Sequence, residues 1–76
     1  MNSKEKNLFV TFYTTAEAMA IEQSCSDNNI EGKLVPVPRV LSAGCGVAWK
    51  GRPEDIDITT QILKDDDIEW EEITIL

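Results

Sequence analysis

One stretch near the start of the chain decides the fold: Leu8-Phe9-Val10-Thr11-Phe12-Tyr13-Thr14-Thr15-Ala16-Glu17, or LFVTFYTTAE. Its first six residues alternate with the period of two that is typical of a strand, which places Leu8, Val10 and Phe12 together on one face. We expect a strand from Leu8 to Tyr13 with this face turned toward the core. The residues that follow predict an immediate change to helix.

A helix is predicted directly after this strand. Thr14-x-x-Glu17 has the spacing of a capping box, in which the two side chains satisfy free backbone donors at a helix start. We expect the helix to run from Thr15 to Asn28, because Asn28-Asn29 can adopt the left-handed conformation that ends a helix. Three residues share the face that should pack on the sheet, at i, i+3 and i+7: Ala18, Ile21 and Cys25.

The rest of the chain predicts three more strands and a second helix. Their expected ranges are a strand at 33–38, a strand at 47–50, a helix at 53–66 and a strand at 68–75. Pro36 and Pro38 cannot donate ladder hydrogen bonds, so the second strand should lie at a sheet edge. The last strand changes parity between Trp70 and Ile73, which predicts a bulge near Glu71-Glu72.

The element order βαββαβ indicates the fold class. With right-handed crossovers, this order is the split βαβ arrangement of the ferredoxin-like fold. We therefore expect an α+β two-layer sandwich, with a four-stranded antiparallel sheet and both helices on one face. Residues 7–76 should form this single domain, and residues 1–6 a polar N-terminal tail.

Composition and charge limit the partners. The chain has 76 residues, of which 42% are hydrophobic and 28% charged, as in an ordinary small globular domain. A domain of this size buries only a small hydrophobic core, so its free energy of unfolding should be low, and formation of a homodimer would raise it. The net charge of −7 repels nucleic acid and anionic lipid, so we expect neither as a partner. The polar start MNSKEK and the lack of a long apolar run predict a cytoplasmic protein with reduced cysteines.

The absence of histidine narrows the chemistry. No side chain of this type exists to activate a serine or cysteine nucleophile or to bind zinc. The motifs for nucleotide and calcium binding are missing as well, and we expect no metal and no cofactor. The acidic residues between Asp65 and Glu72 are interpreted as solvated surface, because consecutive carboxylates do not converge on one ion. The possibilities that remain are thiol chemistry or no chemistry at all.

Cys45 is the candidate functional thiol. Cys25 has the helical phase of a core residue and is interpreted as a small buried hydrophobe. Cys45 lies instead in the segment Ser42-Ala43-Gly44-Cys45-Gly46, where small side chains let a bulky partner approach and backbone donors can hold an anion. The alternative is that these glycines serve a turn between the second and third strands, in which the cysteine merely fits.

The expected strand order gives Cys45 particular neighbours. The first and third strands should be adjacent, so the start of the first helix, with Thr14-Thr15, shares its end of the sheet. The partial positive charge of that helix start can favour a thiolate or hold an anion. Arg39 is the basic side chain expected close by. The basic residues assigned to the opposite end of the sheet are Lys33, Lys50 and Arg52.

Three segments carry a resemblance to one family: Phe12-Tyr13-Thr14-Thr15, Pro36-Val37-Pro38-Arg39-Val40-Leu41-Ser42-Ala43-Gly44-Cys45-Gly46 and Pro53-Glu54-Asp55. Together they make the sequence resemble small bacterial proteins described as selenium or sulfur carrier-like. The resemblance runs across most of the chain, and its P-x-P-R-x-L-S-A-G-C-G string is long and specific. Tyr13 is a local difference, because proline is expected before the two threonines.

The resemblance implies a carrier rather than a turnover enzyme. Cys45 would hold sulfur or selenium as a persulfide or selenopersulfide, received from a cysteine desulfurase-like donor and delivered to an acceptor protein. Gly44 and Gly46 would expose the thiol and supply backbone donors, Ser42 would hydrogen-bond the terminal atom, and Arg39 with Thr14-Thr15 would set the local potential. The alternative is a noncatalytic protein-interaction or small-anion-binding regulatory module that uses the 39–46 loop.

Overall fold

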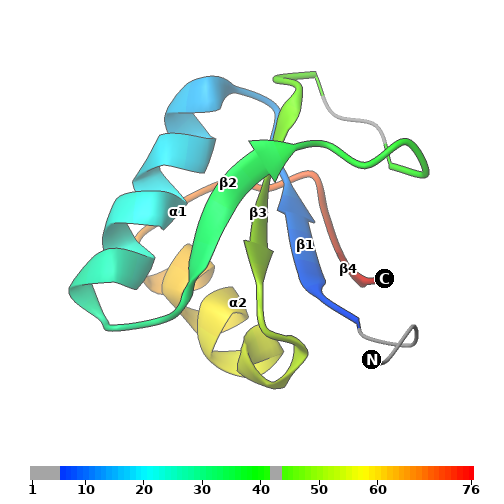
Figure 1. Ribbon diagram of the computed structural model, residues 1–76. Helices are drawn as coiled ribbons and strands as arrows, with labels where there is room; N and C mark the ends of the chain where they lie inside the picture. Colours follow the sequence, from blue (N-terminus) through cyan, green and yellow to red (C-terminus); the bar gives the residue numbers. More distant parts are fainter. Residues whose placement is uncertain (1–5, 42–43) are drawn as a thin grey trace.

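The computed structural model describes residues 6–41 and 44–76 of the chain (Figure 1). Its elements follow the predicted order: β1 (Leu8–Thr11), α1 (Thr15–Asp27), β2 (Gly32–Pro36), β3 (Val47–Gly51), a 3-10 turn (Pro53–Asp55), α2 (Ile56–Asp65) and β4 (Glu72–Ile75). Residues 1–5 of the predicted tail, and Ser42, lie outside the described residues. Among the described residues, neither helix is long and apolar enough to cross a membrane.

The four strands form one antiparallel sheet in the order β2-β3-β1-β4. Both helices lie on the same face of this sheet (Figure 1), which confirms the predicted α+β ferredoxin-like fold. β1 and β3 are the central strands, and β2 and β4 are the edges. As expected from this order, the start of α1 and the β2–β3 connection lie at the same end of the sheet (Figure 1).

The core lies between the helices and one face of the sheet. The core face predicted for this segment is confirmed, because Leu8, Val10 and Phe12 are all fully buried in one cluster. Trp49 of β3 joins this cluster, since its register places it opposite Val10. On the other face, Thr11 is also fully buried. The central strand β1 is therefore enclosed on both sides, which its alternating sequence did not indicate.

α1 begins and ends as predicted. The Thr14 hydroxyl accepts the N–H of Glu17 at 3.3 Å, and the Glu17 carboxylate accepts the N–H of Thr14, so the capping box is complete. At the other end, Asn29 has φ +59°, and the N–H of Ile30 donates to the carbonyl of Cys25 at 2.8 Å, which is a Schellman motif. The predicted packing face is fully buried: Ala18, Ile21 and Cys25.

The fourth strand begins later than predicted. After α2, Asp67 has φ +60°, and the N–H of Ile68 donates to the carbonyl of Leu63 at 2.8 Å. These are the features of a second Schellman motif, in which an apolar residue after the turn packs back on the helix. Ile68 is buried for this reason. The chain first bonds to β1 through the N–H of Glu71, and the regular strand starts at Glu72.

β2 is an edge strand, as its prolines predicted, although it ends at Pro36 rather than two residues later. Beyond it, the N–H of Val37 donates to the carbonyl of Gly46 at 3.1 Å. Bonded and non-bonded pairs alternate along an antiparallel ladder, so the nitrogen of Pro36 points out of the sheet. Proline at this position therefore costs no ladder hydrogen bond.

Candidate functional site

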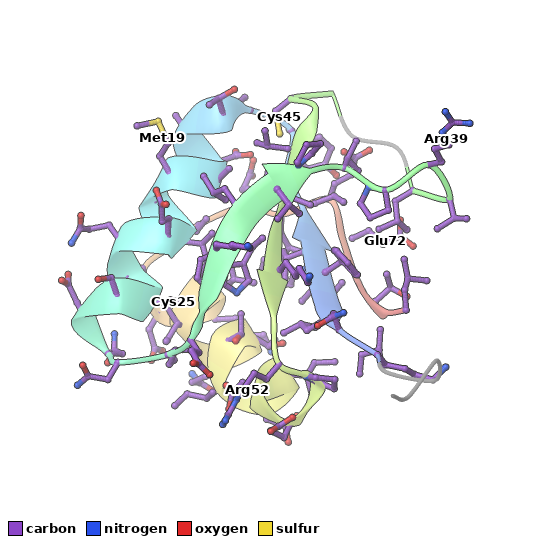
Figure 2. All side chains as sticks on the ribbon, viewed as in Figure 1. Met19, Cys25, Arg39, Cys45, Arg52 and Glu72 are labelled. Carbon is purple, nitrogen blue, oxygen red and sulfur yellow. The ribbon has the colours of Figure 1, made fainter. Side chains whose placement is uncertain are left out.

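Cys45 lies on the β2–β3 connection just before β3 begins, at the end of the sheet where α1 starts (Figure 2). Its side chain is half-buried and packs against the core. The thiol donates a hydrogen bond to the carbonyl oxygen of Val47 at 3.3 Å. The sulfur is therefore partly accessible to solvent, and its orientation is fixed by the strand that follows it.

The two glycines beside Cys45 have different structural roles. Gly46 has φ +78°, a left-handed conformation that strains other L-residues. Its carbonyl accepts the N–H of Val37, which closes the base of the connection. Gly44 lies against the end of β1, because a Cβ on it would stand only 3.3 Å from the carbonyl oxygen of Tyr13. This contact brings the Cys45 segment to the β1–α1 junction, as the strand order predicted.

The start of α1 already holds a carboxylate. Glu17 Oε1 accepts the N–H groups of Tyr13 and Thr14, each at 3.1 Å, and the Thr14 hydroxyl is engaged in the cap. Thr15 is exposed in the first position of the helix. The effect of Thr14-Thr15 on a bound anion stays a prediction. The expectation of an anion at this helix start did not consider that Glu17 already occupies two of its backbone donors. Its capping-box spacing was the available signal.

The basic side chains lie at the ends of the sheet that the strand order predicted, except that Arg39 is not close to Cys45. Lys33 and Lys50 pair across β2 and β3, away from the end that holds Cys45. Arg39 is exposed on the β2–β3 connection, but Figure 2 shows it well separated from Cys45. The structure therefore does not bring Arg39 to the thiol. The predicted contact of Ser42 with a carried atom falls outside the described residues.

Cys25 is a core residue, as predicted. It is fully buried within α1, and it does not form a disulfide with Cys45. Burial raises the pKa of the Cys25 thiol to about 11, with a smaller contribution from the negative charge of Asp55. Because the thiolate is the reactive form of cysteine, Cys25 is both shielded and chemically inert near neutral pH.

This raised pKa predicts a specific loss of stability at high pH. An unfolded cysteine deprotonates near pH 8.5, roughly, whereas folded Cys25 keeps its proton up to about pH 11. Between these values the folded state binds more protons, so the free energy of unfolding falls as pH rises, by up to about 1.4 kcal/mol per pH unit. Urea unfolding from pH 8 to 11 should show this fall in the wild type and a shallower one in Cys25→Ala. Parallel curves would contradict it.

The comparisons with known proteins bear on the whole domain. No curated protein matches the chain. A family model described as "Putative Se/S carrier protein-like" matches residues 7–75. The match spans every strand and helix described above, together with Cys45 and its connection, and it confirms the family that the sequence resembles. With the fold and nearly the full length in agreement, the chain belongs to the Se/S carrier protein-like family.

Proposed function

We propose that this protein carries sulfur or selenium on the Cys45 thiol, as a persulfide or selenopersulfide, and passes it to a partner protein. One observation carries the proposal: Cys45 is partly open to solvent on a glycine-flanked connection, whereas Cys25 is sealed in the core. A donor protein can reach the first thiol and not the second. Membership of a carrier family supports the same assignment.

The loading step needs no base from the protein. The Cys45 thiolate attacks the terminal sulfur of a persulfide on the cysteine of a desulfurase-like donor. A new sulfur–sulfur bond forms to Cys45 while the donor's bond breaks, and the donor cysteine leaves as a thiolate. One thiolate is consumed and one is released, so no oxidant and no net proton transfer are required. The absence of histidine from the chain is therefore no obstacle.

The surroundings of Cys45 fit a thiol that must be approached by another protein. Gly44 and Gly46 are exposed and carry no side chain that would obstruct a donor cysteine. The hydrogen bond to Val47 can exist only while the sulfur is protonated, since a carbonyl oxygen only accepts. Loading therefore begins when the thiol leaves Val47 and releases its proton to solvent, which gives the thiolate that attacks the donor.

The direct test is the site of loading. We expect the wild-type protein to gain the mass of one sulfur atom after incubation with a cysteine desulfurase and cysteine. Peptide mapping without reductant should place that atom on Cys45, and treatment with dithiothreitol should remove it. Cys25→Ala serves as the matched control and should load to the same extent. Loading on Cys25, or no loading of a folded protein, would overturn the assignment.

A further inference from the structure

A second site lies at the end of the sheet opposite Cys45. A pocket of about 300 Å³ opens there beside the paired ends of β2 and β3. Its lining includes three of the seven basic residues of the chain. The lining residues relevant here are Asn7, Lys33, Lys50 and Arg52. None of these residues belongs to the P-x-P-R-x-L-S-A-G-C-G string at residues 36–46 or to the surroundings of Cys45.

Lys33 and Lys50 form an unfavourable pair. They stand directly opposite each other in the β2–β3 register, and like charges in this position destabilise a sheet. Across residues 6–41 and 44–76, the ion pairs of the structure all involve Arg52, and neither lysine has a carboxylate partner. Two lysines thus line one pocket, and among the described residues no carboxylate makes an ion pair with either of them, although Glu31 also belongs to the lining. An anion bound between them would remove the repulsion and gain two charge-assisted contacts.

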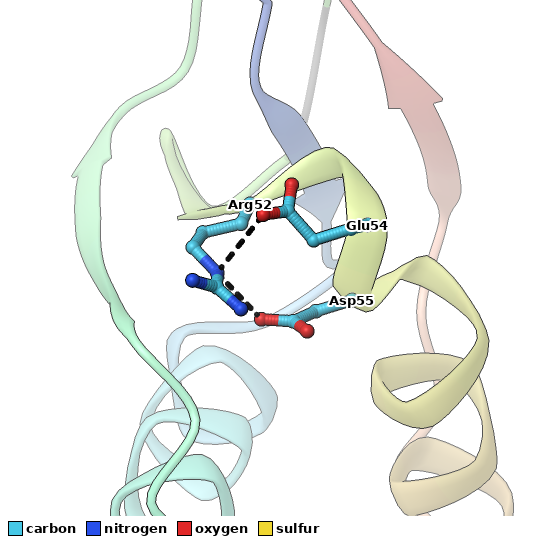
Figure 3. Close-up of polar contacts among 3 residues, drawn as sticks. All are labelled: Arg52, Glu54 and Asp55. Atoms are coloured by element: carbon cyan, nitrogen blue, oxygen red, sulfur yellow. Dashed lines mark hydrogen bonds and ion pairs between the residues drawn. The ribbon is translucent and has the colours of Figure 1, made fainter.

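Arg52 and Glu31 also line this pocket. Arg52 Nε lies 3.5 Å from Glu54 and 3.2 Å from Asp55, which fixes the side chain at the start of the 3-10 turn (Figure 3). These two carboxylates offset much of the Arg52 charge, and Glu31 adds another negative group to the lining. The positive potential therefore comes mainly from Lys33 and Lys50, which favours a compact anion held between them.

We propose that this pocket binds a phosphate group, free or as the monoester of a small molecule. A phosphate dianion can accept from both ammonium groups, while the Asn7 amide supplies a neutral donor. The net charge of −7 opposes extended polyanions such as nucleic acid or an anionic membrane, because their remaining charges would face an acidic protein. A small anion that enters the pocket alone avoids this penalty.

Inorganic phosphate is the first probe, in titrations at constant ionic strength with chloride as the balancing ion. We expect saturable amide shifts at Gly32, Lys33, Lys50 and Gly51 in NMR spectra. The Lys33→Gln/Lys50→Gln double variant should bind at least about tenfold more weakly. Lys64→Gln, which removes a distant lysine of α2, is the matched control and should bind as the wild type does. Tighter binding of glycerol 3-phosphate than of inorganic phosphate would identify a monoester as the preferred ligand.

The double variant also gives a test that does not depend on the spectra. Without phosphate it should be at least as stable as the wild type, because the repulsion between the two lysines is gone. With phosphate the order should reverse, since only the wild type is stabilised by the ligand. Equal stabilisation of both proteins, or the absence of saturable shifts, would overturn the proposal. Cys45→Ser should bind phosphate normally, so this result is independent of the carrier function.

Discussion

Replacing Trp49 by alanine is expected to remove most of the stability of the domain. The indole is 2% exposed and belongs to the core cluster, and its strand position lies opposite Val10 of β1 and Leu34 of β2. Truncation of a buried aromatic side chain costs about 3–5 kcal/mol. A domain of 76 residues has a total stability of roughly 4–11 kcal/mol. Urea unfolding should therefore show a greatly lowered midpoint, or no folded baseline at all.

Trp49→Phe is the matched control for this prediction. The Trp49 Nε1 atom is buried and has no hydrogen-bond partner among the described residues, so phenylalanine removes an unsatisfied donor while keeping most of the apolar ring. We expect it to lose less than half as much stability as Trp49→Ala. An equal loss in both variants would show that the burial of the ring is not the dominant contribution.

Two glycines make room for this indole, which explains why small residues stand in the ends of β2 and β3. A Cβ on Gly32 would overlap Cζ2 of Trp49, and one on Gly51 would lie 3.0 Å from its Nε1. Such contacts in a packed core force side chains or backbone to shift. No local sequence pattern indicates this role of Gly32, because the role depends on pairing with a strand that is distant in the chain.

The parts of the fold that were predictable are those with local causes. Thr14 and Glu17 complete a cap within one turn of helix, and the alternation in β1 identifies the face that joins the core cluster. The start of β4 was not predictable in the same way. Ile68 has the spacing of a strand residue, but its burial comes from the end of α2, where a left-handed Asp67 turns the chain back. Aspartate is less diagnostic of that turn than glycine.

The candidate site also has features that the sequence predicts and features that it does not. Topology was sufficient to place Cys45 at the end of the sheet shared with α1, and the contact between Gly44 and Tyr13 follows from that placement. Topology could not give the path of an irregular connection, so the separation of Arg39 from the thiol had no sequence signal. The position of the Glu17 carboxylate was a local property, and the capping box predicted it.

Cys45→Ser is expected to abolish the delivery of sulfur or selenium while leaving the domain folded. In an assay with a loaded donor and an acceptor protein, transfer that depends on this protein should fall to the rate measured without it. A serine hydroxyl cannot replace the thiolate in sulfur–sulfur exchange, because it is almost entirely protonated and forms no persulfide. The substitution is nearly isosteric at a half-buried position that already accommodates a hydrogen bond to Val47, so stability should change little.

This experiment separates a covalent carrier from an interaction module that uses the same loop. A module acting only by contact would keep its partner and its effect in Cys45→Ser, since its surface is almost unchanged. A covalent carrier would keep the contact but lose the transfer. Cys25→Ala should retain full transfer, although the loss of a buried side chain lowers its stability. Normal transfer by a correctly folded Cys45→Ser protein would therefore exclude the persulfide proposal and favour the contact function.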